Sequence, residues 1–154
     1  MLRPTHAFAL LMLFLLCPTG QVVAEGAAQT LEFRLADDGE ASGWQEMERR
    51  GSDEPIFVSG NVSLNGGHIE RVSFYKDVNG NTSVGFTLTD AGAKAMEATT
   101  SQNLNKRLAI VLNGEVVSAP IIRSTISKKG QITGRFDKDD LLAFFHAIVL
   151  RELP

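Results

Sequence analysis

Cysteine is nearly absent from this chain of 154 residues, because Cys17 is the only one. A lone cysteine cannot close an intramolecular disulfide, so a packed hydrophobic core must stabilise the fold. A strong excess of positive or negative charge is also lacking, since the chain has 15 lysines and arginines and 18 aspartates and glutamates, a formal net charge of −3. This balance gives no electrostatic reason to expect nucleic acid or an anionic lipid surface as a partner.

Long hydrophobic runs are lacking as well. The apolar stretch at residues 7–17 has eleven residues, whereas a membrane-spanning helix needs about 20. Arg3 precedes this stretch, and Val22 and Ala24 supply the short side chains of a cleavage site. These three features together are typical of a cleavable secretory signal. We therefore predict that residues 1–24 are a signal peptide.

The expected cleavage after Ala24 sets the extent of the folded protein. The remaining residues, 25–154, number 154 − 24 = 130, a size that suits one domain. Cys17 would leave with the signal, and Leu16 disfavours a lipid anchor there because lipoprotein signals have a small residue before the cysteine. We expect a single periplasmic or secreted domain with no membrane span once the signal is removed.

Motifs that carry catalysis are also missing. The sequence has no G-x-S-x-G motif, no glycine-rich phosphate loop and no cysteine nucleophile after the signal. His68 and His146 have no second ligand at a metal-binding spacing. We expect no catalytic residue, no metal and no cofactor. The alternative is a secreted hydrolase or metal-dependent enzyme that uses His68 and nearby carboxylates.

One segment has the composition of a calcium loop. Residues 77–83 read D-V-N-G-N-T-S, with oxygen-bearing side chains at alternate positions. A loop of the EF-hand kind needs glycine at its sixth position, which Thr82 occupies. Asn79-Gly80 is instead the dipeptide that a tight hairpin turn prefers. We therefore predict a hairpin turn here.

A strong hairpin signature is present at residues 106–120, which read K-R-L-A-I-V-L-N-G-E-V-V-S-A-P. The apolar run ends at Asn113-Gly114, and both of these residues tolerate the positive φ of a type I′ turn. Upstream, alternating apolar residues over 84–88 indicate a strand. A helix is expected to follow at residues 90–102, so this part of the chain reads strand, helix, hairpin.

A second helix is expected near the end of the chain. Asp137 is a good N-cap, and acidic residues follow it in the first turn, where the helix dipole favours negative charge. Apolar residues at spacings of three and four then form one broad stripe. The stripe consists of Leu141, Leu142, Phe145, Ile148 and Val149.

The other segments complete an α+β pattern. The charged residues 37–55 are the least regular, and we interpret 44–50 as a short helix and 128–130 as a solvated turn. Because hairpin connections dominate, we predict a largely antiparallel sheet of about six strands with two main helices packed on one face. Strands are expected at residues 31–35, 56–58, 69–76, 82–88 and 131–136, in addition to the hairpin.

Five residues are candidates for a binding surface. Pro120 cannot donate to a sheet ladder, so the second hairpin strand should lie at an edge or leave the sheet there. Ile121 and Ile122 then point to opposite sides, which would expose one of them. Tyr75 and Trp44 add amphipathic aromatic side chains, which are enriched at interfaces. The alternative is that all five pack in the core or along its margin.

Five ordered segments share the pattern of a known family: V-G-F-T-L-T-D-A-G-A (84–93), T-T (99–100), K-R-L-A-I-V-L-N-G-E-V-V-S-A-P-I-I (106–122), I-T-G-R-F (132–136) and L-P (153–154). Together they resemble the head subdomain of the first periplasmic domain of SecD and SecDF, membrane proteins of protein export. The match is best over residues 84–136, and residues 31–35 are similar to the family's opening strand. The chain departs from the family pattern at Asn113, where an aspartate is usual, and at residues 151–152, where a small residue and glycine are usual.

The resemblance implies a domain that contacts polypeptide during export. In that family a base subdomain and membrane helices accompany the head, and we expect neither in this stand-alone, exported version. We therefore expect a non-catalytic module that binds polypeptide or an envelope or export partner. The expected mode is partial strand addition beside Pro120, through an apolar surface and not through charge. The alternative is a structural adaptor that binds one folded partner.

Overall fold

The computed structural model describes residues 29–76 and 80–149. The predicted signal peptide, residues 77–79 of the predicted turn and the closing residues 150–154 lie outside the described residues. The elements, in chain order, are β1 (Leu31–Asp37), β2 (Gln45–Met47), β3 (Ile56–Asn65), the 3-10 helix η1 (Gly66–His68), β4 (Ile69–Lys76), β5 (Thr82–Leu88), α1 (Asp90–Gln102), β6 (Arg107–Leu112), β7 (Glu115–Ser118), β8 (Lys129–Thr133) and α2 (Lys138–Val149).

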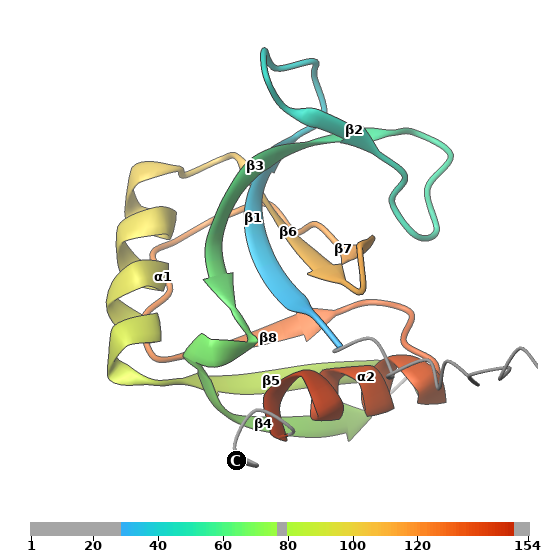
Figure 1. Cartoon of the computed structure of the whole chain (residues 1–154), viewed down its shortest axis with the longest axis vertical. Helices are drawn as coiled ribbons and strands as arrows, with labels where there is room; N and C mark the ends of the chain where they lie inside the picture. Colours follow the sequence, from blue (N-terminus) through green and yellow to red (C-terminus); the bar gives the residue numbers. More distant parts are fainter. Residues whose placement is uncertain (1–28, 77–79, 150–154) are drawn as a thin grey trace, which may run out of the picture.

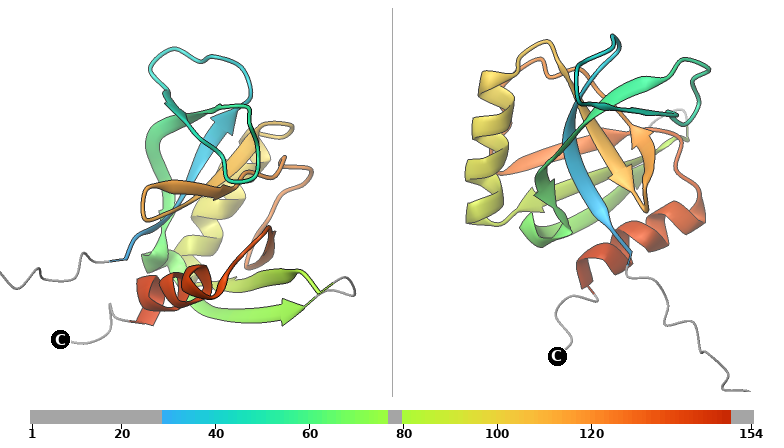
Figure 2. Two further views of the ribbon diagram at one scale, coloured as in Figure 1. Left: turned by 90° about the vertical axis from the view of Figure 1, so that its right-hand side faces the viewer. Right: turned by 45° about the horizontal axis from the view of Figure 1, so that its top comes forward.

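The eight strands of the described residues form two antiparallel sheets (Figure 1). One sheet has the strand order β2-β3-β1-β6-β7, and the other has the order β4-β5-β8. Helix α1 packs on β3 and β5, whereas α2 packs on β4 and β6, so the helices lie on different sides of the domain (Figure 2). The predicted α+β class and antiparallel pairing are confirmed. The strands divide between two sheets, however, and the helices do not share one face.

The division into two sheets occurs at η1. The side chain of Asn65 accepts the N–H of Gly67 at 2.9 Å, and Nδ1 of His68 accepts the N–H of Asn65 at 3.2 Å. This reciprocal capping closes a tight turn, which redirects the chain so that β3 and β4 enter different sheets. His68 therefore has a structural role in the described fold.

Strand β6 is buried on both faces. Ile110 and its alternate neighbours pack in the main core between the two sheets, whereas Val111 packs in a second cluster on the other face. The five-stranded sheet curls around this second cluster until the N–H of Arg50 donates to the carbonyl of Val116 at 3.0 Å. The residues after β2 thereby contact the outer edge of β7. Because apolar clusters cover both faces of β6, the sequence of β6 is a continuous apolar run.

The turn between β6 and β7 has the predicted geometry. Asn113 has φ 51° and Gly114 has φ 84°, as a type I′ turn requires. The side chain of Asn113 also accepts the N–H of Thr30 at 3.0 Å. The predicted elements at residues 69–76, 82–88 and 90–102 are confirmed with the same bounds.

Three sequence-based predictions of secondary structure are wrong. Residues 44–50 do not form a helix, because Gln45–Met47 pairs with β3 as a short edge strand. Strand β3 continues to Asn65, well beyond the predicted end at Val58. Strand β8 begins at Lys129, so 128–130 is not a free turn.

The start of α2 gives a testable prediction about stability. Asp137 accepts the N–H of Asp140 at 2.9 Å, and Asp140 accepts the N–H of Asp137 at 3.0 Å, as in a capping box. Replacing Asp137 with alanine should lower the free energy of unfolding by about 1 kcal/mol, measured by urea denaturation. Asp139→Ala is the control, because this first-turn carboxylate has only the helix-dipole contribution of about 0.3 kcal/mol. Equal losses in the two variants would contradict the capping role.

Candidate functional site

A groove lies beside Pro120, where the two sheets approach each other. It has a volume of about 600 Å³ and lies between the end of β7, the start of β5, residues 133–135 and residues 49–51. We call it the Pro120 groove. The predicted edge position of the second hairpin strand is confirmed, because β7 is an outer strand of its sheet and ends at Ser118. The chain does not leave the ladder at Pro120, however, since the carbonyl of Pro120 accepts the N–H of Leu108 of β6 at 2.9 Å.

The two isoleucines after Pro120 are not equally available. Ile121 is half-buried and forms an isolated antiparallel bridge with Arg107. Ile122 is only 3% exposed, packs in the main core and donates its N–H to the carbonyl of Lys106 at 2.8 Å. Ile122 therefore cannot contact a partner while the domain is folded.

The edge of β7 beside the groove is already occupied. Arg49 forms a parallel bridge with Val116, whose carbonyl accepts the N–H of Arg50. Further along β7, Oγ of Ser118 donates to the carbonyl of Thr133 at 2.9 Å. An added strand would have to displace these contacts, so the structure does not support strand addition next to Pro120.

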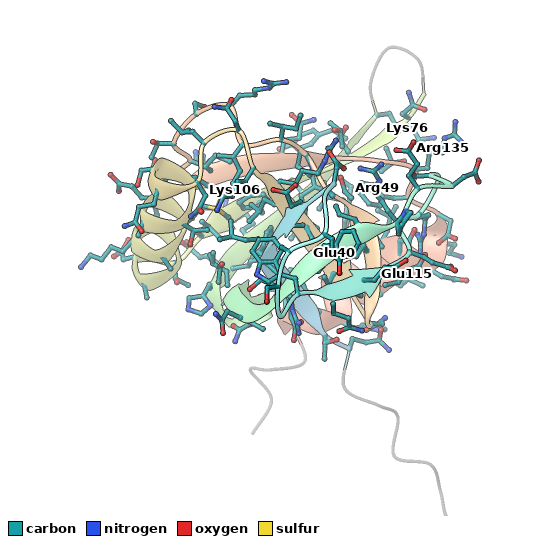
Figure 3. The ribbon with its side chains drawn as sticks, turned by 90° about the horizontal axis from the view of Figure 1, so that it is seen from above. Glu40, Arg49, Lys76, Lys106, Glu115 and Arg135 are labelled. Atoms are coloured by element: carbon teal, nitrogen blue, oxygen red, sulfur yellow. The ribbon has the colours of Figure 1, made fainter. Side chains whose placement is uncertain are left out.

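Arginine side chains give the Pro120 groove a polar, basic lining in place of the expected apolar one. Figure 3 labels Arg49 and Arg135, and both of these side chains line the Pro120 groove. Arg50 donates to both oxygens of Glu115, at 2.8 and 2.5 Å, and also to Asp140. The hydrogen bonds from Arg50 hold the pKa of the Glu115 carboxyl below its ordinary value. Arg135 has no hydrogen-bond or ion-pair partner among the described residues.

Tyr75 and Trp44 lie on elements away from Pro120. Tyr75 is on β4 and is 55% exposed. A Cβ atom on Gly85 would come within 2.7 Å of Cε2 of Tyr75, so the tyrosine ring covers the space that the glycine leaves free. Trp44 is half-buried and donates its backbone N–H to the carbonyl of Ala41 at 3.0 Å. The structure does not bring the five predicted residues together.

The outer edge of β4 offers free backbone groups. β4 is an outer strand of its sheet, at the lower margin of the domain in Figure 1, and no described residue pairs with its outer side. Leu88 of β5 donates its N–H to the carbonyl of Lys128 at 2.8 Å, so Leu88 faces β8. Because antiparallel hydrogen bonds alternate along a strand, Val72, Phe74 and Lys76 of β4 direct their backbone N–H and C=O groups away from β5. We call residues 71–76 the β4 edge.

Two aromatic side chains flank this edge. Phe74 is 42% exposed and Tyr75 is 55% exposed, and they point to opposite faces of the sheet because side chains alternate along a strand. A hollow of about 520 Å³ lies beside Tyr75 on the solvent-facing side, next to Gly85 and Gln131. The sequence analysis missed Phe74, although the alternation of Val72 with Phe74 was visible in the predicted strand.

The described residues contain no cluster of three or more histidine, cysteine, aspartate or glutamate side chains that could hold a metal ion. His146 is exposed on α2, far along the chain from the capping residue His68. Within residues 29–76 and 80–149, neither helix has the length and apolar character needed to cross a membrane.

Sequence relatives agree with the resemblance noted above. The family described as "SecDF, P1 head subdomain" matches residues 43–152. Protein translocase subunit SecD of Aquifex aeolicus is 39% identical over 106 residues, which are 69% of this chain and 20% of that protein. The SecD of Leptotrichia buccalis is 38% identical over 116 residues, 75% of this chain and 24% of that protein. The chain thus spans about a fifth of the length of these curated relatives.

Solved structures show the same relationship. A structure described as SecDF, a membrane component that enhances protein export, is 28% identical and superposes with a TM-score of 0.60, covering 80% of this chain and 62% of that one. A SecDF structure in a "super-membrane-facing form" gives a TM-score of 0.61 at 28% identity, covering 80% of this chain and 19% of that one. Sequence and structure together confirm the resemblance, and this chain belongs to the SecDF P1 head subdomain family.

Proposed function

We propose that this domain is a non-catalytic module of protein export that binds extended polypeptide weakly along the β4 edge. Family membership supports the connection with export, since the relatives are named as protein translocase subunits. The predicted signal at residues 1–24 supports a periplasmic or secreted location for residues 25–154 as one domain. The observation that carries the binding proposal is the free backbone edge of β4 with its two exposed aromatic side chains.

Strand addition fits the chemistry of this edge. Backbone N–H and C=O groups of Val72 and Phe74 would pair with any extended chain, because main-chain hydrogen bonds do not depend on sequence. Phe74 and Tyr75 would contact side chains on the two faces of the added strand. The short contact should give a Kd in the micromolar range or weaker, about −8 kcal/mol or less in magnitude. Salt should have little effect, because the contacts are backbone and apolar.

Replacing Phe74 with proline should weaken binding of a reduced, permanently unfolded protein by about tenfold, or 1.4 kcal/mol. Proline removes an outward N–H and the aromatic ring, whereas the bonds between β4 and β5 come from the alternate residues. Fluorescence titration measures the affinity, and a thermal melt checks that the variant folds. Phe74→Lys is a second variant, because a charge on an edge strand also discourages pairing.

Ile121→Asp, directly after Pro120 in the chain, is the matched control and should bind like the wild type. If Ile121→Asp weakens binding and neither Phe74 variant does, the polypeptide site is the groove. If the wild-type domain shows no binding at up to about 1 mM, a contact weaker than about 4 kcal/mol, the polypeptide proposal fails.

A structural adaptor for one folded partner is the second candidate. It is favoured by an apolar stripe that α2 leaves exposed on its outer face, Leu142, Phe145 and Val149. The three residues follow the helical spacing of three and four, so they lie on one side of α2. Substitution of Phe145 with aspartate should reduce capture of a folded envelope partner and leave the affinity for unfolded protein unchanged.

A further inference from the structure

Two antiparallel copies of the β4 edge, centred on Ser73, would place compatible side chains opposite each other. We propose that a second copy of this chain pairs antiparallel with the β4 edge, about a two-fold axis at Ser73, and that the two three-stranded sheets join into one continuous sheet. The pairing goes beyond the proposed function and does not depend on it.

The backbone pattern selects this register. An antiparallel ladder requires that outward-facing residues pair with outward-facing residues. Val72 and Phe74 face outward, so Val72 can lie opposite Phe74 of the second copy, and Phe74 opposite the other Val72. Each of these two positions forms a pair of hydrogen bonds. Ser73 then lies opposite Ser73 of the second copy, at a position without backbone hydrogen bonds between the strands.

The side chains match in the same register. Val72 and Phe74 are apolar neighbours across the strands, on the face of the sheet that carries the main core and α2. Arg71 lies opposite Tyr75 of the second copy on the solvent-facing side, where a guanidinium can stack on the aromatic ring. Ser73 lies at the axis, where two small side chains meet without a clash. Opposite residues are favourable in each of these pairs, and none of them brings like charges together.

Neighbouring registers are less favourable. A shift of the strands in one direction would place Val72 opposite Lys76, and a shift in the other direction would place Phe74 opposite Glu70. A bulge between Ile69 and Arg71 also interrupts the regular strand and limits the paired stretch at that end. The contact is therefore short and reversible, and it occupies the same backbone groups that extended polypeptide would use.

Disulfide trapping tests the register directly. Cys17→Ser removes the natural thiol from the full chain, and Ser73→Cys then introduces one cysteine at the proposed axis. Opposed residues at such a position have Cα atoms about 4.5 Å apart, within the range of about 4.4–6.8 Å that a disulfide spans. Mild oxidation should therefore shift this variant from monomer to covalent dimer on a non-reducing gel.

Cysteines at Arg71 and Tyr75 are the register controls. Two copies of Arg71→Cys would hold their thiols about 14 Å apart along the strands, as would two copies of Tyr75→Cys, so neither variant alone should crosslink. A mixture of the two variants should crosslink, because residue 71 lies opposite residue 75. Gln131→Cys on the other edge strand measures random collision.

Ser73→Cys crosslinking that does not exceed that of Gln131→Cys would overturn the inference, as would efficient crosslinking of Arg71→Cys with itself. Added unfolded protein distinguishes the two proposals. If Ser73→Cys crosslinks and unfolded protein neither binds nor competes, the pairing stands and the polypeptide function fails. If unfolded protein binds and Ser73→Cys stays monomeric, the polypeptide function stands and the pairing fails.

Discussion

Replacing Arg50 with methionine should lower the free energy of unfolding by about 3 kcal/mol. Arg50 joins three separate parts of the chain, because its side chain contacts Glu115 on β7 and Asp140 on α2 while its backbone caps the edge of β7. The side chain of Asp140 is only 8% exposed, so the variant leaves a buried carboxylate without its cation. Removing one partner of a buried ion pair costs about 3–5 kcal/mol, and the partial exposure of Arg50 favours the lower value.

The cost of Arg50→Met should depend on pH. The hydrogen bonds from Arg50 lower the pKa of the Glu115 carboxyl. The hydrogen bond to Glu115 and, less strongly, the one to Asp140 raise the pKa of Arg50 above its already high ordinary value. A carboxyl group with a lowered folded pKa stabilises the fold above its unfolded pKa of about 4.3, and this contribution is lost as the pH falls through the folded value. The difference between wild type and variant should therefore be full at pH 7 and shrink below about pH 4.

Arg49→Met is the matched control for this prediction. Arg49 is adjacent in sequence and pairs with Asp38 at 3.7 Å, but the side chain of Asp38 is 57% exposed. An exposed pair of this kind contributes less than about 1 kcal/mol. Denaturant unfolding of both variants at pH 7 and pH 3.5 provides the measurement. Equal losses for Arg49→Met and Arg50→Met at pH 7 would contradict the role assigned to Asp140.

Replacing Gly92 with alanine should destabilise the domain by about 2 kcal/mol, although the same change inside an ordinary helix stabilises it by about 1 kcal/mol. Gly92 lies in the first turn of α1, where Thr89 accepts its N–H at 3.1 Å and donates its own backbone N–H to the carbonyl of His68 at 2.9 Å. A Cβ atom on Gly92 would come within 2.4 Å of that carbonyl oxygen. Backbone cannot rotate away as a side chain can, so α1 would have to move away from η1.

Gly60→Ala is the control for this effect. Gly60 lies in β3, and a Cβ atom there would have no neighbour within 4 Å. Its replacement should be neutral or stabilising, because glycine loses more conformational entropy on folding than alanine does. Thermal unfolding followed by circular dichroism compares the two variants. A melting temperature for Gly92→Ala at or above that of the wild type would show that α1 does not need this close approach.

Local chemistry explains the elements that the sequence predicted correctly. The turn at Asn113-Gly114 depends on two residues that tolerate positive φ, and the start of α2 depends on the capping side chain of Asp137. The helix at residues 90–102 likewise begins at a capping residue, Thr89. In each case the side chains that select the conformation lie within a few residues of the backbone they act on.

Long-range pairing explains the predictions that were wrong. Gln45–Met47 has no strand-like composition, and it becomes β2 because the long strand β3 offers a free edge to it. Gly130 is read as a turn residue in sequence, yet it pairs with Phe86 of β5 within β8, and the ring of Phe86 occupies the space that a side chain at Gly130 would need. Neither partner is near in sequence, so periodicity and turn preferences carried no information about these contacts.

The predictions about the candidate site likewise divide between local chemistry and long-range contacts. The sequence by itself determined that position 120 cannot donate to a ladder, because proline lacks an N–H, and that the SecDF head family shares this chain's motifs. Only the tertiary structure decided that residues 49–50 cover β7, that Ile122 enters the core and that no strand within residues 29–76 and 80–149 pairs with the outer edge of β4. Which strand lies at an edge depends on the order of strands in the sheet, and that order is set by contacts between segments far apart in the chain.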